Sequence, residues 1–188
     1  MYRFYFAFIF VCITNGAVSA ELSVSNSCTE KPSPFELSEL KFAFDLTNIA
    51  KINVLNGASA ASVISFNNNW LPELHVITTS EDQVSGGINT SGGYQTLGVS
   101  NIQGLFEKIK YDHSSNEYFT KVKKAMGLTK PNDIQVINHN AHKVFVISDA
   151  FDDKEAIYII RQNDPRIIML VADLSPPKLN RVLENICL

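Results

Sequence analysis

Four short apolar runs follow one another in the C-terminal third of the chain. They are rich in β-branched residues, are separated by Asn, Asp or Pro, and centre on Ile134–Ile137, Val144–Ile147, Ile157–Ile160 and Ile167–Val171. Short β-branched runs between turn-forming residues are typical of strands. Connections this short predict antiparallel neighbours, because a parallel crossover requires a dozen or more residues.

A helix is predicted directly after the last of these strands. Ser175 fits the N-cap position, and Pro176 and Pro177 fit the first turn, where the missing N–H groups cost little. Apolar residues then recur at helical spacing, at Leu179, Val182, Leu183 and Ile186. This single apolar face predicts a helix that packs on the sheet and closes it.

The stretch Phe35–Leu55 has two interpretations. Apolar residues alternate with other residues over Leu40–Leu46, which favours a half-buried strand, and Ile52 and Val54 continue the alternation. Leu37, Leu40 and Phe44 also fit a helical stripe. We interpret Leu40–Leu46 as a strand, and we expect a further strand over Leu74–Thr79.

Two amphipathic helices are predicted in the middle of the chain. The first covers Ile102–Ile109 and begins at Ser100 or Asn101, and the second places Tyr118, Phe119, Val122 and Met126 on one face. Together these patterns predict one α+β domain. It consists of an antiparallel β-sheet with helices packed mainly on one face and the C-terminal helix closing the sheet.

A Gly/Ser/Thr-rich stretch from Ser80 to Gly98 separates the two halves. We expect a long flexible loop, and long loops in compact domains are often functional. Asn89-Thr90-Ser91 is a glycosylation sequon, which matters only if the host glycosylates exported proteins. The loop, with the only tryptophan nearby in sequence, is the first candidate for a contact surface, made of Trp70, Gly86, Gly87, Asn89, Gly92, Gly93 and Tyr94.

The first twenty residues have the pattern of a secretory signal peptide. Arg3 precedes an apolar core of about ten residues, and Ala17-Val18-Ser19-Ala20 ends in the small-x-small pattern of a cleavage site. We therefore expect a signal over 1–20, a single domain over 21–188, and a periplasmic or secreted protein.

Two cysteines remain after removal of this segment. Cys28 and Cys187 lie near opposite ends of the mature chain. Export combined with two cysteines predicts one disulfide between them.

Charge narrows the classes of partner. The formal net charge is −3 and no basic cluster stands out, so nucleic acid is a poor partner. No second apolar segment reaches spanning length, so we expect no stable membrane insertion after signal removal. We expect another protein as the partner, and the sequence leaves the oligomeric state open.

No motif in the chain carries a specific chemistry. His139 and His142 have a spacing that would suit a metal on a helix, but they fall between two strands, where a solvated turn is expected. The sequence contains no nucleophile elbow, no P-loop and no dinucleotide fingerprint. We therefore predict no catalytic residue, no metal site and no cofactor.

The order of two helices, several antiparallel strands and a final helix resembles the PsbP-like fold group. The likeness covers roughly the last ninety residues, where Glu155–Gln162 and Arg166–Asp173 resemble the closing strands and Ser175–Ile186 the covering helix. The resemblance implies a binding, chaperone or assembly role by analogy of fold.

The leading hypothesis is an exported, non-catalytic binding protein, either an accessory factor or an immunity protein that neutralises a toxin. One alternative is a small secreted hydrolase or metal-dependent enzyme that uses His139 and His142. A second alternative is a carrier of a small ligand, although nothing in the sequence selects one.

Overall fold

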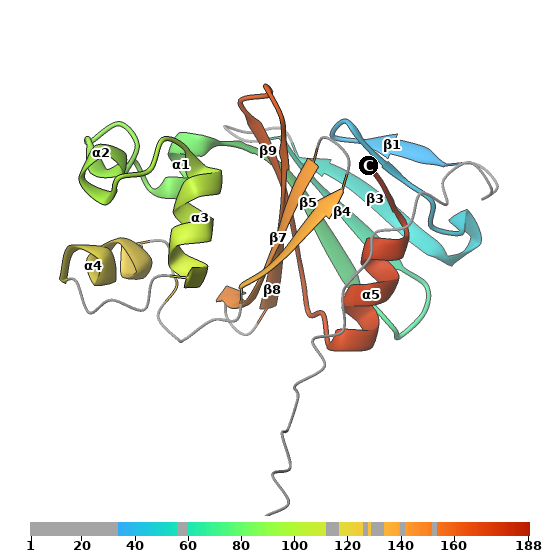
Figure 1. The fold of residues 1–188 in the computed structure, drawn as a ribbon. Coiled ribbons are helices and arrows are strands. Elements are labelled where there is room, and N and C mark those ends of the chain that lie inside the picture. Colours follow the sequence, from blue (N-terminus) through green and yellow to red (C-terminus); the bar gives the residue numbers. More distant parts are fainter. Residues whose placement is uncertain are drawn as a thin grey trace, which may run out of the picture.

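The structure is a computed structural model, and it describes residues 34–55, 60–111, 117–125, 128, 134–139, 142–151 and 154–188. These residues form an α+β fold with two antiparallel sheets (Figure 1). The small sheet has the order β1-β2-β10, with β1 (Phe35–Leu37), β2 (Leu40–Phe42) and β10 (Ile186–Cys187). The large sheet has the order β3-β4-β5-β9-β8-β7-β6, with β3 (Ile49–Leu55), β4 (Ala60–Phe66), β5 (Glu73–Ser80), β6 (Ile134–His139), β7 (His142–Phe151), β8 (Lys154–Arg161) and β9 (Arg166–Ala172).

Helices cover the large sheet on both faces. One face carries α1 (Glu81–Ser85), α2 (Gly93–Leu97), α3 (Ile102–Tyr111) and α4 (Glu117–Ala125). The opposite face carries the small sheet and α5 (Pro176–Glu184), as Figure 1 shows. No helix in the described part of the chain is long and apolar enough to cross a membrane.

The predicted C-terminal strands are confirmed as antiparallel neighbours, β6 to β9. Their side chains alternate between two cores, because successive residues of a strand point to opposite faces. On β7, Val144 and Val146 join the core under α5, while Phe145 and Ile147 join the core under α1–α4. The central strands are therefore buried on both faces.

The predicted closing helix is also confirmed. Pro176 and Pro177 lie in the first turn of α5, but the hydroxyl of Ser175 makes no capping hydrogen bond. Its carbonyl instead accepts hydrogen bonds from the N–H groups of Lys178 and Leu179. After α5, Ile186 pairs with Phe42, so the C-terminal strand β10 is joined to β2, one of the first described strands.

The ambiguous stretch Phe35–Leu55 contains strands β1, β2 and β3 and no α-helix. The strand predicted over Leu40–Leu46 ends early, at Phe42. The reason is local: the side chain of Asp45 accepts hydrogen bonds from Thr47 and caps a short 3₁₀ helix, η2 (Leu46–Asn48).

The prediction of a long flexible loop over Ser80–Gly98 is wrong. Ser80 and Gln83 form a capping box that starts α1, and Gly86 ends the helix in the left-handed conformation. The turn that follows is held by Thr90, whose hydroxyl bonds to the Asp82 carboxylate. Three apolar side chains then anchor the segment in the core under the helices: Ile88, Tyr94 and Leu97.

The two predicted middle helices are confirmed as α3 and α4. Asn101 caps α3, because its side chain accepts a hydrogen bond from the N–H of Gly104. Met126, which was placed on the apolar face of the second helix, lies outside the described residues.

A charged cluster joins the two sheets. Glu39 lies in the β1–β2 turn with a positive φ of 66°, and its carboxylate pairs with Arg166 and, at 3.6 Å, with Arg161. Asp164, in the β8–β9 turn, accepts hydrogen bonds from the side chain and the backbone of Arg166. These bonds, followed by the nearby arginine charges, lower the pKa of Asp164 to about 2.

The close approach of α4 to α2 at Gly93 gives a first prediction. A Cβ at this position would lie 2.7 Å from the Tyr118 hydroxyl and 2.8 Å from the Ile88 carbonyl oxygen. Gly93→Ala is therefore expected to lower the free energy of unfolding by about 1–3 kcal/mol. Gly104→Ala is the matched control, since its Cβ would make only ordinary contacts in α3 and it should be neutral or stabilise by up to about 1 kcal/mol. Equal urea midpoints for the two variants would contradict the packing described.

The Asp164 turn gives a second prediction. A carboxyl whose pKa is lowered by folding contributes stability above its unfolded pKa, and this contribution is lost as the pH falls from about 4 to about 2. Asp164→Asn should lower the urea midpoint at pH 7, and the difference from the wild type should shrink as the pH falls from about 4 and be small by about pH 2. Asp173→Asn serves as the control. The side chain of Asp173 is 70% exposed, and its carboxylate forms a long ion pair with Lys178, with 3.6 Å between the charged atoms. A pH-independent difference would show that the charge of Asp164 is not what stabilises the turn.

Candidate functional site

The structure separates Trp70 from the rest of the predicted contact surface. Trp70 packs against Phe44 and Phe66, on the face of the sheet covered by α5. Gly93 and Tyr94 are buried residues of α2, on the opposite face of the sheet. The seven residues proposed from the sequence therefore do not form one surface.

The remaining residues of that predicted surface belong to the folded α1–α2 segment. Gly86 and Gly92 are exposed at helix ends, and both have positive φ angles. The side-chain oxygen of Asn89 accepts hydrogen bonds from the Ser85 hydroxyl and the Thr90 N–H. The Asn89 side chain therefore stabilises the α1–α2 segment through these two hydrogen bonds.

A groove of about 620 Å³ lies beside Trp70. One wall is a stripe of α5 at helical spacing, formed by Pro177, Asn180, Arg181 and Glu184. The other wall belongs to the segment between β2 and β3 and is formed by Ala43, Phe44, Asp45 and Asn48. Phe66, Trp70 and Asn185 complete the lining. The groove thus joins segments from the two ends of the described chain, and we call it the Trp70 groove.

Trp70 and Arg181 lie against each other in the lining of this groove. The Arg181 guanidinium carbon lies 4.3 Å from the centroid of the indole, which is a cation–π arrangement. The other ring neighbours are Phe66, at 5.4 Å between centroids, and Phe44, at 6.2 Å. The indole Nε1 is buried and has no hydrogen-bond partner among the described residues, and a buried donor without a partner costs about 1–3 kcal/mol.

The rim of the Trp70 groove is polar and charged. Asp45 is exposed, and hydrogen bonds from the Thr47 hydroxyl and N–H lower its pKa, so it is ionised at neutral pH. Across the groove, the side chain of Asn185 donates to the Arg181 carbonyl and stabilises the end of α5. The residues that line the groove include amides, carboxylates and a guanidinium but no His, Cys or Ser. This set suits recognition by contact and hydrogen bonding.

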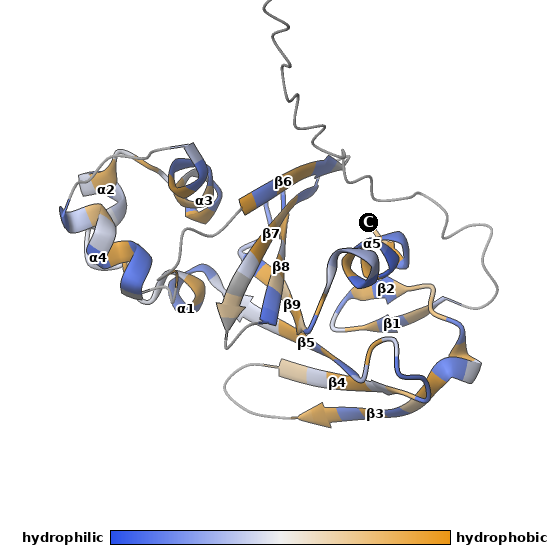
Figure 2. Cartoon of the chain, turned by 90° about the horizontal axis from the view of Figure 1, so that it is seen from below, coloured by the Kyte–Doolittle hydropathy of each residue, from blue (hydrophilic) through white to orange (hydrophobic). Residues whose placement is uncertain are grey.

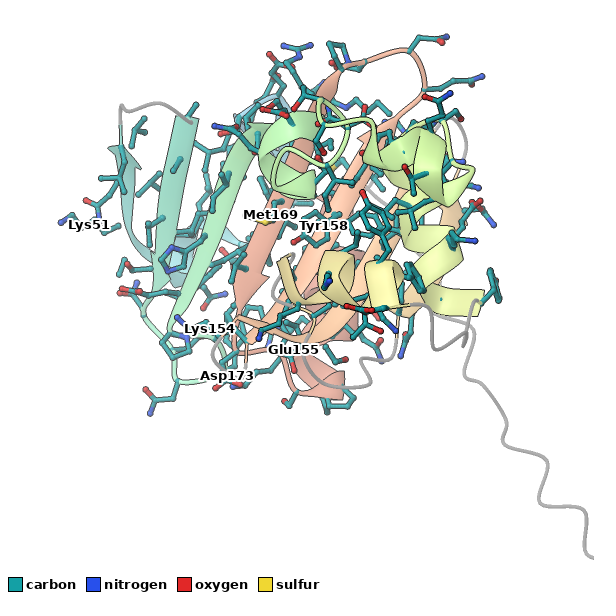
Figure 3. The ribbon with its side chains drawn as sticks, turned by 90° about the vertical axis from the view of Figure 1, so that its left-hand side faces the viewer. Lys51, Lys154, Glu155, Tyr158, Met169 and Asp173 are labelled. Atoms are coloured by element: carbon teal, nitrogen blue, oxygen red, sulfur yellow. The ribbon has the colours of Figure 1, made fainter. Side chains whose placement is uncertain are left out.

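A second surface, which the sequence analysis missed, lies on β3. Most of the exposed large apolar residues of the described chain lie on this strand and on η2 before it: Leu46 (50% exposed), Ile52 (40%), Val54 (62%) and Leu55 (54%). Figure 2 shows β3 as the outermost strand, with hydrophobic residues at its arrow end. Figure 3 shows that α1–α4 leave β3 and β4 uncovered, with Lys51 at the outer edge. The signal in the sequence was the apolar alternation at Ile52 and Val54, for which no covering element was assigned.

The other candidates from the sequence are only partly described. His139, at the end of β6, is paired in register with His142, at the start of β7. Within the described residues, no group of three or more His, Cys, Asp or Glu side chains could hold a metal ion. Cys28 lies outside the described residues, so its pairing with Cys187 stays a prediction.

Comparisons with known proteins give no relative for this chain: no family model, no curated protein and no solved structure matches it.

Proposed function

We propose that this protein is an exported, non-catalytic binding protein that holds a segment of a partner protein in the Trp70 groove. The observation that carries the proposal is the pairing of Trp70 with Arg181 in the lining of this groove of about 620 Å³. Trp and Arg are the residue types most enriched where binding energy concentrates in protein interfaces.

The shape of the groove favours a polypeptide segment. It is open to solvent along its length, because Asn180, Arg181 and Glu184 are all exposed on its α5 wall. An aromatic centre with a polar rim is the usual anatomy of a protein interface. An accessory factor or an immunity protein would use such a site to hold its target without chemical change.

A small-ligand carrier is the second candidate, and the size of the groove favours it. A volume of about 620 Å³ is within the range of about 300–1,000 Å³ that is typical of small-molecule sites. Because Trp70 is the only tryptophan in the chain, its fluorescence reports on this groove alone. If a small ligand from a screened panel shifts the emission of Trp70, the result would favour a small-ligand carrier over a protein that binds another protein.

Two features of the sequence support the proposed location and role. The signal pattern over 1–20 supports a periplasmic or secreted location, and the resemblance of the C-terminal half to the PsbP-like fold group supports a binding or assembly role. The end-to-end disulfide between Cys28 and Cys187 belongs to the same proposal, because disulfides persist in exported proteins.

The groove is tested by capture of partner proteins from the host's own extract. Arg181→Ala and Glu184→Lys are expected to reduce the amount of the captured partner at least tenfold, since they remove the cation over Trp70 and reverse a rim charge. Lys121→Ala is the matched control, because Lys121 is 71% exposed on α4, on the opposite face of the sheet. Capture that is equal in all three variants and in the wild type would exclude the groove as the binding site.

The disulfide is tested by alkylation of the purified protein without reductant. We expect neither Cys28 nor Cys187 to be alkylated, and we expect reduction to lower the free energy of unfolding by up to roughly 5 kcal/mol, the chain-entropy value for a loop of about 160 residues. Cys28→Ser and Cys187→Ser should each reproduce the reduced protein. Full alkylation of both thiols in native material would disprove the pairing.

A further inference from the structure

The outer side of β3 is the starting point for a further inference. β3 pairs with β4, and no described strand pairs with its other side. An edge strand presents a row of backbone N–H and C=O groups that can accept another strand. Natural proteins protect such edges with bulges, charges, Pro or a covering element.

On β3 this protection is confined to the beginning of the strand. The register with β4 shifts between Ile49 and Lys51, and Lys51 is the only charged residue of the strand. From Lys51 to Leu55 the register is regular, and no charged residue follows Lys51. The midpoint of this unprotected segment is Asn53.

We propose that a second copy of this chain pairs antiparallel with Lys51–Leu55, about a twofold axis at Asn53. In this register Ile52 lies opposite Val54 of the second copy, and the same contact occurs twice. Lys51 lies opposite Leu55 of the second copy, so the two lysines do not face each other. Two seven-stranded sheets thereby join into one continuous sheet.

The side chains of β3 complement their own copy. Ile52 and Val54 point to the same face, since they are paired with two buried residues of β4 that are two positions apart, Ile64 and Ser62. Ile64 belongs to the core under α5. Cross-strand apolar pairs stabilise a sheet, whereas like charges directly opposite destabilise it. On the other face, the methylene stem of Lys51 can cover Leu55 of the second copy while its ammonium stays in water. The segment contains no pattern of charges that would select a different partner.

The dimer is expected to be weak. Five residues per strand bury much less than the total of about 1,600 Å² that is typical of stable interfaces. We therefore expect a dissociation constant in the micromolar range. The molecular mass of the protein in solution must be measured over a series of concentrations.

Sedimentation equilibrium of the purified protein tests the association. The wild type should reach the mass of a dimer in the micromolar range, and Val54→Lys should weaken the association at least tenfold. Tyr111→Lys is the control, since Tyr111 is also exposed, at 68%, but lies on α3. A wild type that stays monomeric, or a Val54→Lys variant that dimerises normally, would overturn the proposal.

Cysteine cross-linking tests the register. Directly opposite residues of an antiparallel pair have Cα atoms about 4.5–5.5 Å apart, which a disulfide can span. Asn53→Cys should therefore give a reductant-sensitive dimer linked through position 53, and Lys51→Cys should not. Cross-linking at Lys51→Cys, or at Ile52→Cys in preference to Asn53→Cys, would overturn the twofold axis at Asn53. None of these measurements depends on the Trp70 groove, so the two proposals can fail separately.

Discussion

The burial of both faces of the central strands is the constraint on which the rest of the structure depends. On β7, four successive side chains, Val144–Ile147, are fully buried, although neighbouring residues point to opposite faces. A sheet with two apolar faces requires a covering layer on each side. The helices α1–α4 supply one layer, and the small sheet with α5 supplies the other. The second layer is assembled from both ends of the described chain, since β10 pairs with β2.

Both candidate surfaces lie where this covering ends. The Trp70 groove is the seam at which α5 meets the turn before β3, so its lining combines the side of a helix with an irregular segment. The edge at β3 lies beyond both layers, and its apolar residues stay exposed there. The two layers cover the central strands of the large sheet but do not extend to its β3 edge. The groove and the edge are therefore left open to partners.

The sequence predicted the elements that are defined by local periodicity. The runs at Val144–Ile147 and Ile167–Val171 became strands, and the stripe from Leu179 to Ile186 became the closing helix. Composition misled over Ser80–Gly98, because glycines typical of loops occupy left-handed positions at the ends of short helices, as at Gly86 and Gly98. The capping box at Ser80 and Gln83 was a readable signal of that helix. The Gln83 side-chain oxygen accepts a hydrogen bond from the Ser80 N–H, and the Ser80 hydroxyl oxygen accepts one from the Gln83 N–H. This reciprocal pair identifies a helix start better than glycine content identifies a loop.

The candidate site could not be predicted in the same way, because it depends on contacts between distant residues. Trp70 was selected for its residue type. Arg181, which lies over its ring, belongs to α5, and the position of α5 depends on the core that it packs against and on the pairing of β10 with β2. The exposure of Ile52 and Val54 likewise depends on what the other elements fail to cover. Local pattern decides which residues can be buried, whereas the order of strands and layers decides which of them are.

The two proposed surfaces are compatible because they use different parts of the same strand region. The groove wall ends at Asn48, and the segment proposed to pair with a second copy begins at Lys51, after the shift in register. A dimer joined along β3 would therefore carry two Trp70 grooves. Two linked sites bind a partner with repeated segments more tightly than either site alone, provided that the partner can reach both. A weak contact along β3 is sufficient for this purpose, because a partner held in both grooves would itself stabilise the pair of copies.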